Sequence, residues 1–335
     1  MNEKLVIAVD AMGGENSPKK IIEAISDVIT NDDQLFFNIF GNINLLTPII
    51  EKHKISKNRY EIFDAQVNIT DDESPLQAAK KGNKSSMWQA IESVKNNKSH
   101  IALSAGNTGA LLILSKMILN MIDGIDKPAL AGLWPNKKGM NVVLDLGANI
   151  ECNQKNLVDF SLMGSSLYKS LFPDDVPKVA ILNVGSEEIK GHDIVKEAYQ
   201  VLKNKKNNDF EFKGYVEGNN MVSGDVNVIV TDGFTGNIAL KTAEGTADLV
   251  TSELKKSLNS NIYSKILTFL NYVNFKKFKD SLDPRKYNGA IFLGLNGPVV
   301  KSHGSTDSLG FAHSIKMCKK VITNNLMEKI KKNLN

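Results

Sequence analysis

Short apolar runs alternate along this chain with longer amphipathic segments. Runs rich in Val, Ile and Leu predict strands at residues 5–9, 35–40, 101–103, 142–146, 179–184 and 226–230. Several are apolar at nearly every position, which is typical of strands buried on both faces of a parallel sheet. Periodic apolar positions predict helices at residues 18–30, 85–96, 108–121, 155–171, 193–203, 235–258 and 307–331. This alternation predicts an α/β fold with a mostly parallel sheet.

The pattern shows no internal repeat and no clear domain boundary. Residues 1–335 are therefore expected to form a single domain, with a helical excursion around residues 254–282, and the polar stretch 203–208 is expected to be a solvated loop. Apolar residues at helical spacing, followed by lysines, mark the excursion: Leu254, Leu258, Ile262, Ile266, Phe269, Leu270, Val273, Lys276, Lys277 and Lys279. Such a helix fits an anionic membrane interface. It also fits a core or dimer helix with a solvated basic end, which the sequence alone favours.

Composition narrows the possible partners. The chain carries 41 basic and 37 acidic residues, giving a net charge of +4, and 42% of its residues are hydrophobic. That charge is too small for the concentrated basic face expected of a nucleic-acid-binding protein. Arg59 and Arg285 are the only arginines. An anion would therefore have to be bound by backbone N–H groups and lysines rather than by bidentate arginine clamps.

The cysteine spacing, the first residues and the length of the apolar runs indicate the cellular compartment of the protein. Cys152 and Cys318 are far apart and match no metal-binding spacing, so a reducing, cytoplasmic compartment is the simplest interpretation. The first residues run directly into an apolar strand pattern without a signal-peptide arrangement. No apolar run approaches the roughly 20 residues needed to cross a bilayer. The nucleotide fingerprints GxGxxG and GxxxxGK[ST] are absent.

The most informative polar residues lie where predicted strands end. Six turns combine glycine with small polar residues and precede helices, at residues 10–14, 104–109, 145–149, 183–188, 232–237 and 302–307. In a parallel sheet such turns collect at one edge, where ligands bind. Glycine lets the backbone approach a ligand closely, and helix N-termini present free N–H groups to an anion. A single turn of this composition is common in loops that bind no ligand, but six such turns predict an anion-binding cleft.

No pattern indicates a covalent nucleophile. The GxSxG elbow is absent, and the five histidines form no obvious Ser-His-Asp or Cys-His set. His303, between Ser302 and Gly304, is the best-placed histidine, although a turn histidine that only bonds the backbone fits equally well. Cys152 fits a small buried hydrophobe better than an acyl acceptor.

These turns resemble the motifs of one known family. Segments 7–14, 104–110, 145–149, 182–191, 231–237, 287–290 and 300–305 are similar, in the same order, to motifs of the bacterial phosphate acyltransferases of phospholipid synthesis, the PlsX family. The resemblance implies a three-layer α/β/α fold like that of isopropylmalate dehydrogenase. It also implies transfer of a long-chain acyl group from acyl carrier protein to inorganic phosphate, giving acyl phosphate. Two departures are Glu15-Asn16, where the family often has Asp-His, and Asn219-Asn220, where it commonly has Arg-Asp.

The resemblance further implies a homodimer without metal or cofactor. It places the protein at the inner face of the cell membrane, loosely attached and in contact with the downstream acyltransferase. Because acyl carrier protein is acidic, its dock should be rich in basic residues. The candidate clusters are Lys80, Lys81 and Lys84; Lys276, Lys277, Lys279, Arg285 and Lys286; and Lys316, Lys319 and Lys320.

Attack of phosphate on a thioester requires positioning and an oxyanion hole more than a strong base. We therefore predict Asn107, Lys301 and His303 as catalytic residues. The residues expected to bind phosphate or the thioester are Gly13, Gly14, Gly106, Thr108, Gly109, Asp145, Asn149, Asn183, Asp232, Gly233, Asn237, Lys241 and Ser305. Within these turns the carboxylates of Asp10, Asp145 and Asp232 are expected to anchor loops or cap helices rather than act as bases.

Three other functions are compatible with parts of the sequence. A short-chain phosphotransacylase that uses acyl-coenzyme A would need similar loops and similar chemistry. A nicotinamide-dependent dehydrogenase of similar fold is disfavoured, because we find neither an arginine cluster for a carboxylate substrate nor an aspartate set for a divalent metal. A non-catalytic membrane scaffold would not need glycine-rich turns at several strand ends.

Overall fold

The computed structural model describes residues 4–205, 209–281 and 283–334, except for the side chains of residues 266, 267, 279 and 281. In this part of the chain eleven strands form one sheet, in the order β3-β2-β1-β4-β11-β10-β5-β6-β9-β7-β8. The strands are β1 (Leu5–Asp10), β2 (Leu35–Gly41), β3 (Tyr60–Asp64), β4 (Ile101–Ser104), β5 (Ala129–Asn136), β6 (Gly139–Leu144), β7 (Lys178–Leu182), β8 (Glu211–Val216), β9 (Val228–Val230), β10 (Ala290–Leu293) and β11 (Val299–Lys301).

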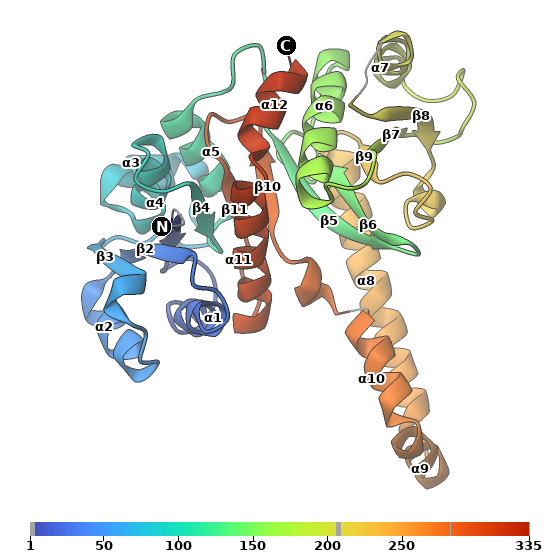
Figure 1. The fold of residues 1–335 in the computed structure, drawn as a ribbon. Helices are drawn as coiled ribbons and strands as arrows, with labels where there is room; N and C mark the ends of the chain where they lie inside the picture. Colours follow the sequence, from blue (N-terminus) through green and yellow to red (C-terminus); the bar gives the residue numbers. More distant parts are fainter. Residues whose placement is uncertain (1–3, 206–208, 282, 335) are drawn as a thin grey trace.

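Helices cover both faces of this sheet. They are α1 (Lys19–Ile29), α2 (Ile43–Lys52), α3 (Pro75–Lys81), α4 (Ser86–Lys95), α5 (Thr108–Leu119), α6 (Gln154–Leu171), α7 (Asp193–Asn204), α8 (Gly233–Leu258), α9 (Ile262–Leu270), α10 (Tyr272–Ser281), α11 (Ser308–Thr323) and α12 (Leu326–Leu334). Figure 1 shows α11, α12 and α6 packed together in front of the sheet, with α3, α4 and α5 behind it.

The central strands are apolar at most positions because both faces of the sheet are buried. Along β1, Ile7 and Val9 belong to the core under α1, α6 and α11, whereas Ala8 belongs to the core under α4 and α5. The same alternation of faces separates Val142 from Val143 on β6. Two cores on opposite faces make the three-layer α/β/α arrangement that the sequence predicts.

The sheet reverses direction at its centre. Seven of the ten strand pairs are parallel, and three are antiparallel: β11 with β10, β10 with β5, and β5 with β6. The strands β6, β9, β7 and β8 therefore run opposite to β1, β2, β3, β4 and β11. The expectation that all six glycine turns share one sheet edge is wrong, because the carboxyl ends of the two halves point in opposite directions.

All six predicted strands are confirmed, but the strands that create the reversal, β5 and β10, were not predicted. The helix predicted at residues 307–331 is in fact two helices. Asn325, with φ of 50°, interrupts it between α11 and α12, and asparagine tolerates this left-handed conformation better than most residues. The loop predicted at residues 203–208 begins later, because α7 continues to Asn204; residues 206–208 lie outside the described part.

The helical excursion starts earlier than residue 254 and is not one continuous helix. Figure 1 shows α8 leaving the body of the protein, α9 at the far tip, and α10 returning toward the sheet. Large apolar side chains along it are exposed to solvent: Leu249, Val250, Ile262, Tyr263, Phe269, Leu270, Tyr272, Val273 and Phe278. The side chains of Ile266 and Lys279 lie outside the described residues. Among the described residues no helix has both the length and the apolar character needed to cross a membrane.

Two glycines of α8 provide a matched stability test. A Cβ at Gly236 would collide with the backbone carbonyl oxygen of Asp145, whereas a Cβ at Gly245 would meet nothing within 4 Å. We predict that Gly236→Ala destabilises the protein by about 1–3 kcal/mol through steric strain. Gly245→Ala should stabilise it by up to about 1 kcal/mol through helix propensity. Thermal unfolding followed by circular dichroism measures both, and equal melting temperatures for the two variants would contradict this packing.

Candidate active site

Three of the predicted turns converge at the carboxyl ends of β1, β4 and β11. We call residues 10–14, 104–109 and 302–307 the first turn group. At its centre lies the buried carboxylate of Asp10, which accepts hydrogen bonds from Ser86 Oγ and Ser104 Oγ, both at 2.7 Å. Ser104 Oγ in turn accepts from the Gly106 N–H at 3.0 Å. Burial raises the pKa of Asp10, and these hydrogen bonds oppose the rise. Asp10 therefore ties two turns together, as expected of an anchoring carboxylate.

Glycine is required where these turns touch. A Cβ on Gly13 would lie 2.5 Å from the Gly106 nitrogen. A Cβ on Gly14 would lie 2.9 Å from the Gly304 oxygen, and Gly14 also has a φ of 83°, a value that side chains disfavour. The Glu15 N–H donates to the same Gly304 oxygen at 3.0 Å. The first turn group is thus packed backbone against backbone.

The buried Lys20 and the half-buried Lys301 point into the first turn group. Lys20 is only 4% exposed and donates from Nζ to the Gly304 oxygen at 2.5 Å. Lys301 Nζ lies 3.4 Å from the Ala105 oxygen and also donates to the Ser302 oxygen. Burial lowers the pKa of Lys20, and it lowers the pKa of Lys301 to about 8. Two lysine ammonium groups therefore lie beside the same turns. The composition predicts an anion site of this type, built from lysines and backbone N–H groups rather than from arginines.

The sequence pattern does not predict Lys20 as a site residue, because a lysine on a predicted helix is usually a surface residue. A signal for it does exist in the printed sequence. Lys20, Ala24 and Val28 follow each other at intervals of four residues, and all three are buried on α1. A lysine within a buried apolar stripe indicates that its amine reaches a polar partner.

The N-terminus of α5 completes the first turn group. Asn107 Oδ1 accepts from the Ala110 N–H at 3.0 Å, which caps the helix. Asn107 Nδ2 donates to the backbone oxygens of Asp71 and Glu73 at 2.9 and 3.0 Å. In the described part of the chain, the N–H groups of Thr108 and Gly109 have no hydrogen-bond acceptor. The side chain of Asn107 is thus occupied, so its direct contact with a substrate remains a prediction, while the two N–H groups after it are available.

His303 lies at the rim of this group. Its Nδ1 is 3.0 Å from Ser305 Oγ, and its backbone N–H donates to Asn288 Oδ1 at 2.9 Å. Desolvation and the positive charge of Lys301 lower the pKa of His303. Glu244 and Lys241 of α8 also act on this pKa. These two residues form an exposed ion pair of 2.7 Å, which places the first half of α8 within electrostatic reach of His303.

Residues 145–149 and 232–237 form a second turn group at the carboxyl ends of β6 and β9. Asp145 is fully buried and accepts hydrogen bonds from the backbone N–H groups of Leu130, Gly147, Ala148 and Asn149 and from Asn149 Nδ2, at 2.8–3.1 Å. Burial raises the pKa of Asp145 against these hydrogen bonds. As in the first group, a buried aspartate holds the turn in place.

Most other polar side chains of the second turn group also bond the protein itself. Asp232 caps α8 by accepting from the Thr235 N–H at 2.8 Å. The Gly233 N–H donates to the Asn149 oxygen at 2.8 Å, and Asn237 Nδ2 donates to the Leu146 oxygen at 3.3 Å. The loop-anchoring and capping roles expected for Asp145 and Asp232 are confirmed. A substrate contact by any of these residues remains a prediction.

Asn183 belongs to neither turn group. It follows β7, and its Nδ2 donates to the backbone oxygens of Gly185 and Lys190 at 3.1 and 3.0 Å. Among the described residues, no side-chain hydrogen bond joins Asn183 to the turns of residues 145–149 or 232–237. Asn183 therefore shapes its own loop.

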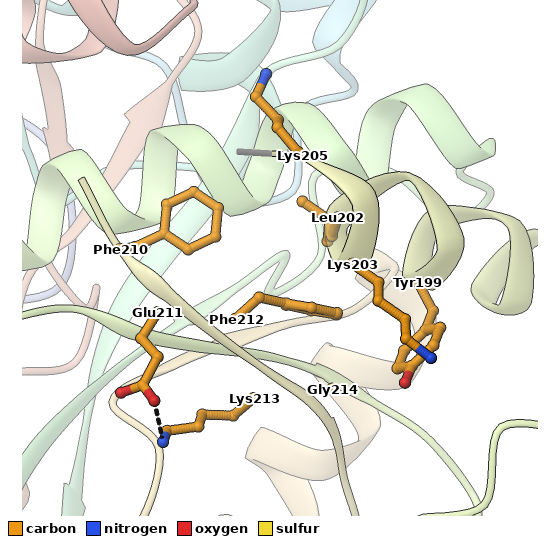
Figure 2. Close-up of a pocket in the computed structure, with 9 residues that line it drawn as sticks. All are labelled: Tyr199, Leu202, Lys203, Lys205, Phe210, Glu211, Phe212, Lys213 and Gly214. Atoms are coloured by element: carbon orange, nitrogen blue, oxygen red, sulfur yellow. Dashed lines mark hydrogen bonds and ion pairs between the residues drawn. The ribbon is translucent and has the colours of Figure 1, made fainter. Parts of the chain in front are cut away.

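A cavity of about 560 Å³ lies away from both turn groups, between α7 and β8. Figure 2 shows Phe210, Phe212 and Leu202 beside it, with Glu211 and Lys213 paired at the side. None of the predicted site residues lines this cavity. No cluster of three or more metal-ligating side chains occurs in the described part of the chain.

Comparison with known proteins assigns the chain to a family. Residues 5–329 match the family described as "Fatty acid synthesis protein". The phosphate acyltransferase of Pelagibacter ubique (strain HTCC1062) is 58% identical over 334 residues, which covers 100% of both chains. The chain belongs to the phosphate acyltransferase family. Membership of this family makes the protein an acyltransferase, as the resemblance of its motifs predicts.

Solved structures support the fold assignment. EutD phosphotransacetylase from Staphylococcus aureus superposes with a TM-score of 0.63 at 16% identity, covering 96% of this chain and 94% of that one. A 4-hydroxythreonine-4-phosphate dehydrogenase from Salmonella typhimurium superposes with a TM-score of 0.53 at 14% identity, covering 95% and 99%. At such low identity the likeness shows the fold alone, which phosphotransacetylases and this type of dehydrogenase share.

The lowered pKa of Lys301 predicts how phosphate binding should depend on pH. Below pH 8 the amine is protonated and attracts an anion; above pH 8 it becomes neutral, so phosphate affinity should fall by up to about tenfold per pH unit. Lys301→Arg should remove this fall, because a guanidinium stays charged. The Michaelis constant for phosphate, measured between pH 7 and 9.5, tests this. The same fall in both proteins would show that Lys301 is not the titrating group.

Proposed function

We propose that this protein transfers a long-chain fatty acyl group from acyl carrier protein to inorganic phosphate, giving acyl phosphate for phospholipid synthesis. The observation that carries the proposal is the first turn group. Lys20 and Lys301 bring two cations together with the free N–H groups of Thr108 and Gly109. This combination suits a small, doubly charged oxyanion.

The reaction needs no covalent intermediate on the protein. A phosphate oxygen attacks the thioester carbon, and the carbonyl oxygen takes the negative charge of the tetrahedral intermediate. The C–S bond then breaks, and the thiol leaves as thiolate because its pKa of about 8.5 is low enough. The phosphate proton is released in the same step and balances the charge. Backbone N–H groups and lysines supply the positioning and charge stabilisation that this sequence of steps requires.

The half-buried Cys152 and the exposed His303 fit this assignment. Burial raises the pKa of Cys152 to about 11, so its thiol is protonated near neutral pH and is a poor acyl acceptor. His303 and Lys241 lie on the side of the first turn group that faces α8. We assign that side to the arriving thioester, because His303 and Lys241 are exposed there, whereas Lys20 and Lys301 bond the backbone of the turns.

Acyl carrier protein as donor, rather than acyl-coenzyme A, is supported by the surface beside α8. Exposed lysines of α10 and the segment after it offer positive charge to an acidic carrier: Lys276, Lys277, Arg285 and Lys286. Arg285 is partly engaged, since it pairs with Asp283 and Asp307. The lysines therefore contribute most of the free positive charge that would attract the carrier.

One assay tests the proposed function. Purified protein is incubated with radiolabelled phosphate and either long-chain acyl carrier protein or acetyl-coenzyme A. We expect labelled acyl phosphate from the acyl carrier protein, and at least tenfold less product with Lys301→Met, because a cation at the phosphate is lost. Product from acetyl-coenzyme A alone would indicate a short-chain phosphotransacylase. Absence of product from both donors would favour a non-catalytic scaffold.

The exposed apolar residues of α8, α9 and α10 support a second part of the proposal. Phe269 and Leu270 are 78% and 75% exposed, and large apolar patches on a protein surface usually bind a partner. With lysines following on α10, we assign this excursion to peripheral contact with an anionic membrane, which is consistent with the inner face of the cell membrane. A homodimer could cover part of the same surface.

Liposome flotation separates these two uses of the excursion. On vesicles containing anionic lipid, Phe269→Asp or Leu270→Asp should reduce the floating fraction severalfold, because each places a charge in the apolar interface. Asn274→Asp adds the same charge at an already polar position and serves as the control. Light scattering after size exclusion reports the oligomeric state. Equal flotation of Leu270→Asp and wild type, or loss of a dimer without loss of flotation, would contradict membrane contact.

A further inference from the structure

A segment between β3 and α4 is hydrogen-bonded to the first turn group. We call residues 66–83 the strap; it contains α3 and three consecutive acidic residues, Asp71, Asp72 and Glu73. Val67, near its start, and Ser85, just after its end, form a β-bridge. The strap is therefore closed on itself, and its acidic stretch contacts Asn107 of the first turn group.

The backbone of the strap is fixed by specific contacts. Asn107 Nδ2 binds the backbone oxygens on either side of Asp72, those of Asp71 and Glu73, at 2.9 and 3.0 Å. Glu73 Oε1 accepts from the backbone N–H and the hydroxyl of Thr70, both at 2.9 Å, and Lys81 Nζ also binds Glu73 Oε1 at 2.5 Å. These hydrogen bonds fix the position of the backbone that carries the three acidic side chains.

Of the three acidic side chains, Asp71 is the one that faces the anion site. Its Oδ2 lies 4.0 Å from the position that a Cβ of Gly304 would take. Asp71 acts electrostatically on both Lys20 and Lys301, and in each case its negative charge favours the protonated amine. Asp72 instead interacts with Thr70, Glu73 and Lys81, all within the strap.

A carboxylate beside two lysines resembles a bound anion. Asp71 is the carboxylate that acts on both Lys20 and Lys301; Glu15 and Asp307 also act on Lys20, and Asp10 also acts on Lys301. An incoming anion must therefore compete with the Asp71 carboxylate for the two cations. A dianion such as phosphate gains more from two lysines than the single carboxylate does, whereas a monoanion does not.

We propose that Asp71 sets the affinity of the anion site: its carboxylate competes with an incoming anion for Lys20 and Lys301 and weakens the binding of every anion, so that phosphate is still bound whereas singly charged anions, which gain less from two lysines, are not retained. This inference rests on the proposed function in taking phosphate as the physiological ligand. It concerns the binding step, and it can be measured without an acyl donor.

The test compares Asp71→Asn with Asp72→Asn, which removes the same charge one residue further along the strap. Isothermal titration with inorganic phosphate gives the dissociation constant, and competition with acetate shows whether a monoanion is retained. For Asp71→Asn we expect phosphate to bind about three- to tenfold more tightly, because an opposing charge is lost. Acetate, which should not compete in the wild type, should compete measurably in this variant. Asp72→Asn should behave as the wild type.

The outcomes distinguish this proposal from the proposed function. Unchanged or weaker phosphate binding by Asp71→Asn would overturn it, since Asp71 would then not compete with the ligand. Equal tightening by both variants would also overturn it, because the effect would come from the general charge of the strap. Phosphate binding that responds as expected, in a protein that makes no acyl phosphate, would leave the role of Asp71 intact while the proposed acyl transfer failed.

Discussion

The buried carboxylate of Asp10 is the interaction on which the anion site depends. It is almost fully buried, so its charge is compensated by the hydroxyls of Ser86 and Ser104, by the Met12 N–H and by the positive charge of Lys301. Through Ser104 it fixes the turn that begins α5, and through its own turn it holds Gly13 against Gly106. Without it, the free N–H groups and the two lysines would not face one common point. In the other half of the sheet, the buried carboxylate of Asp145 holds its turn in the same way, by accepting hydrogen bonds from backbone N–H groups.

The reversal of strand direction at the centre of the sheet separates the two turn groups, and these groups differ in their polar residues. Because β10 and β5 run antiparallel to their neighbours, the two turn groups lie at carboxyl ends that point in opposite directions. The first turn group holds the charged residues suited to phosphate, whereas the second is largely saturated by its own hydrogen bonds. The helix α8 links them, since it starts in the second group and brings Lys241 and Glu244 toward His303.

The sequence predicts the fold class and the polar turns, because both follow from local patterns. Apolar runs identify the buried strands, and glycines identify positions such as Gly14 where positive φ or close contact is required. The sequence does not predict the direction of short strands such as β10, since pairing is set by tertiary contacts. It also does not show that Asn107 is occupied by the strap, or that Lys20 and Asp71 meet at the anion site. These are contacts between residues far apart in the chain.

A crystal structure with bound phosphate tests the central assignment most directly. Phosphate should lie between the Nζ atoms of Lys20 and Lys301, within hydrogen-bonding distance of the Thr108 N–H. Crystals of Lys301→Met, prepared at the same phosphate concentration, should show that position without phosphate. Phosphate found only at the turns of residues 145–149 and 232–237, or equally occupied in Lys301→Met, would contradict the assignment of the first turn group as the phosphate site.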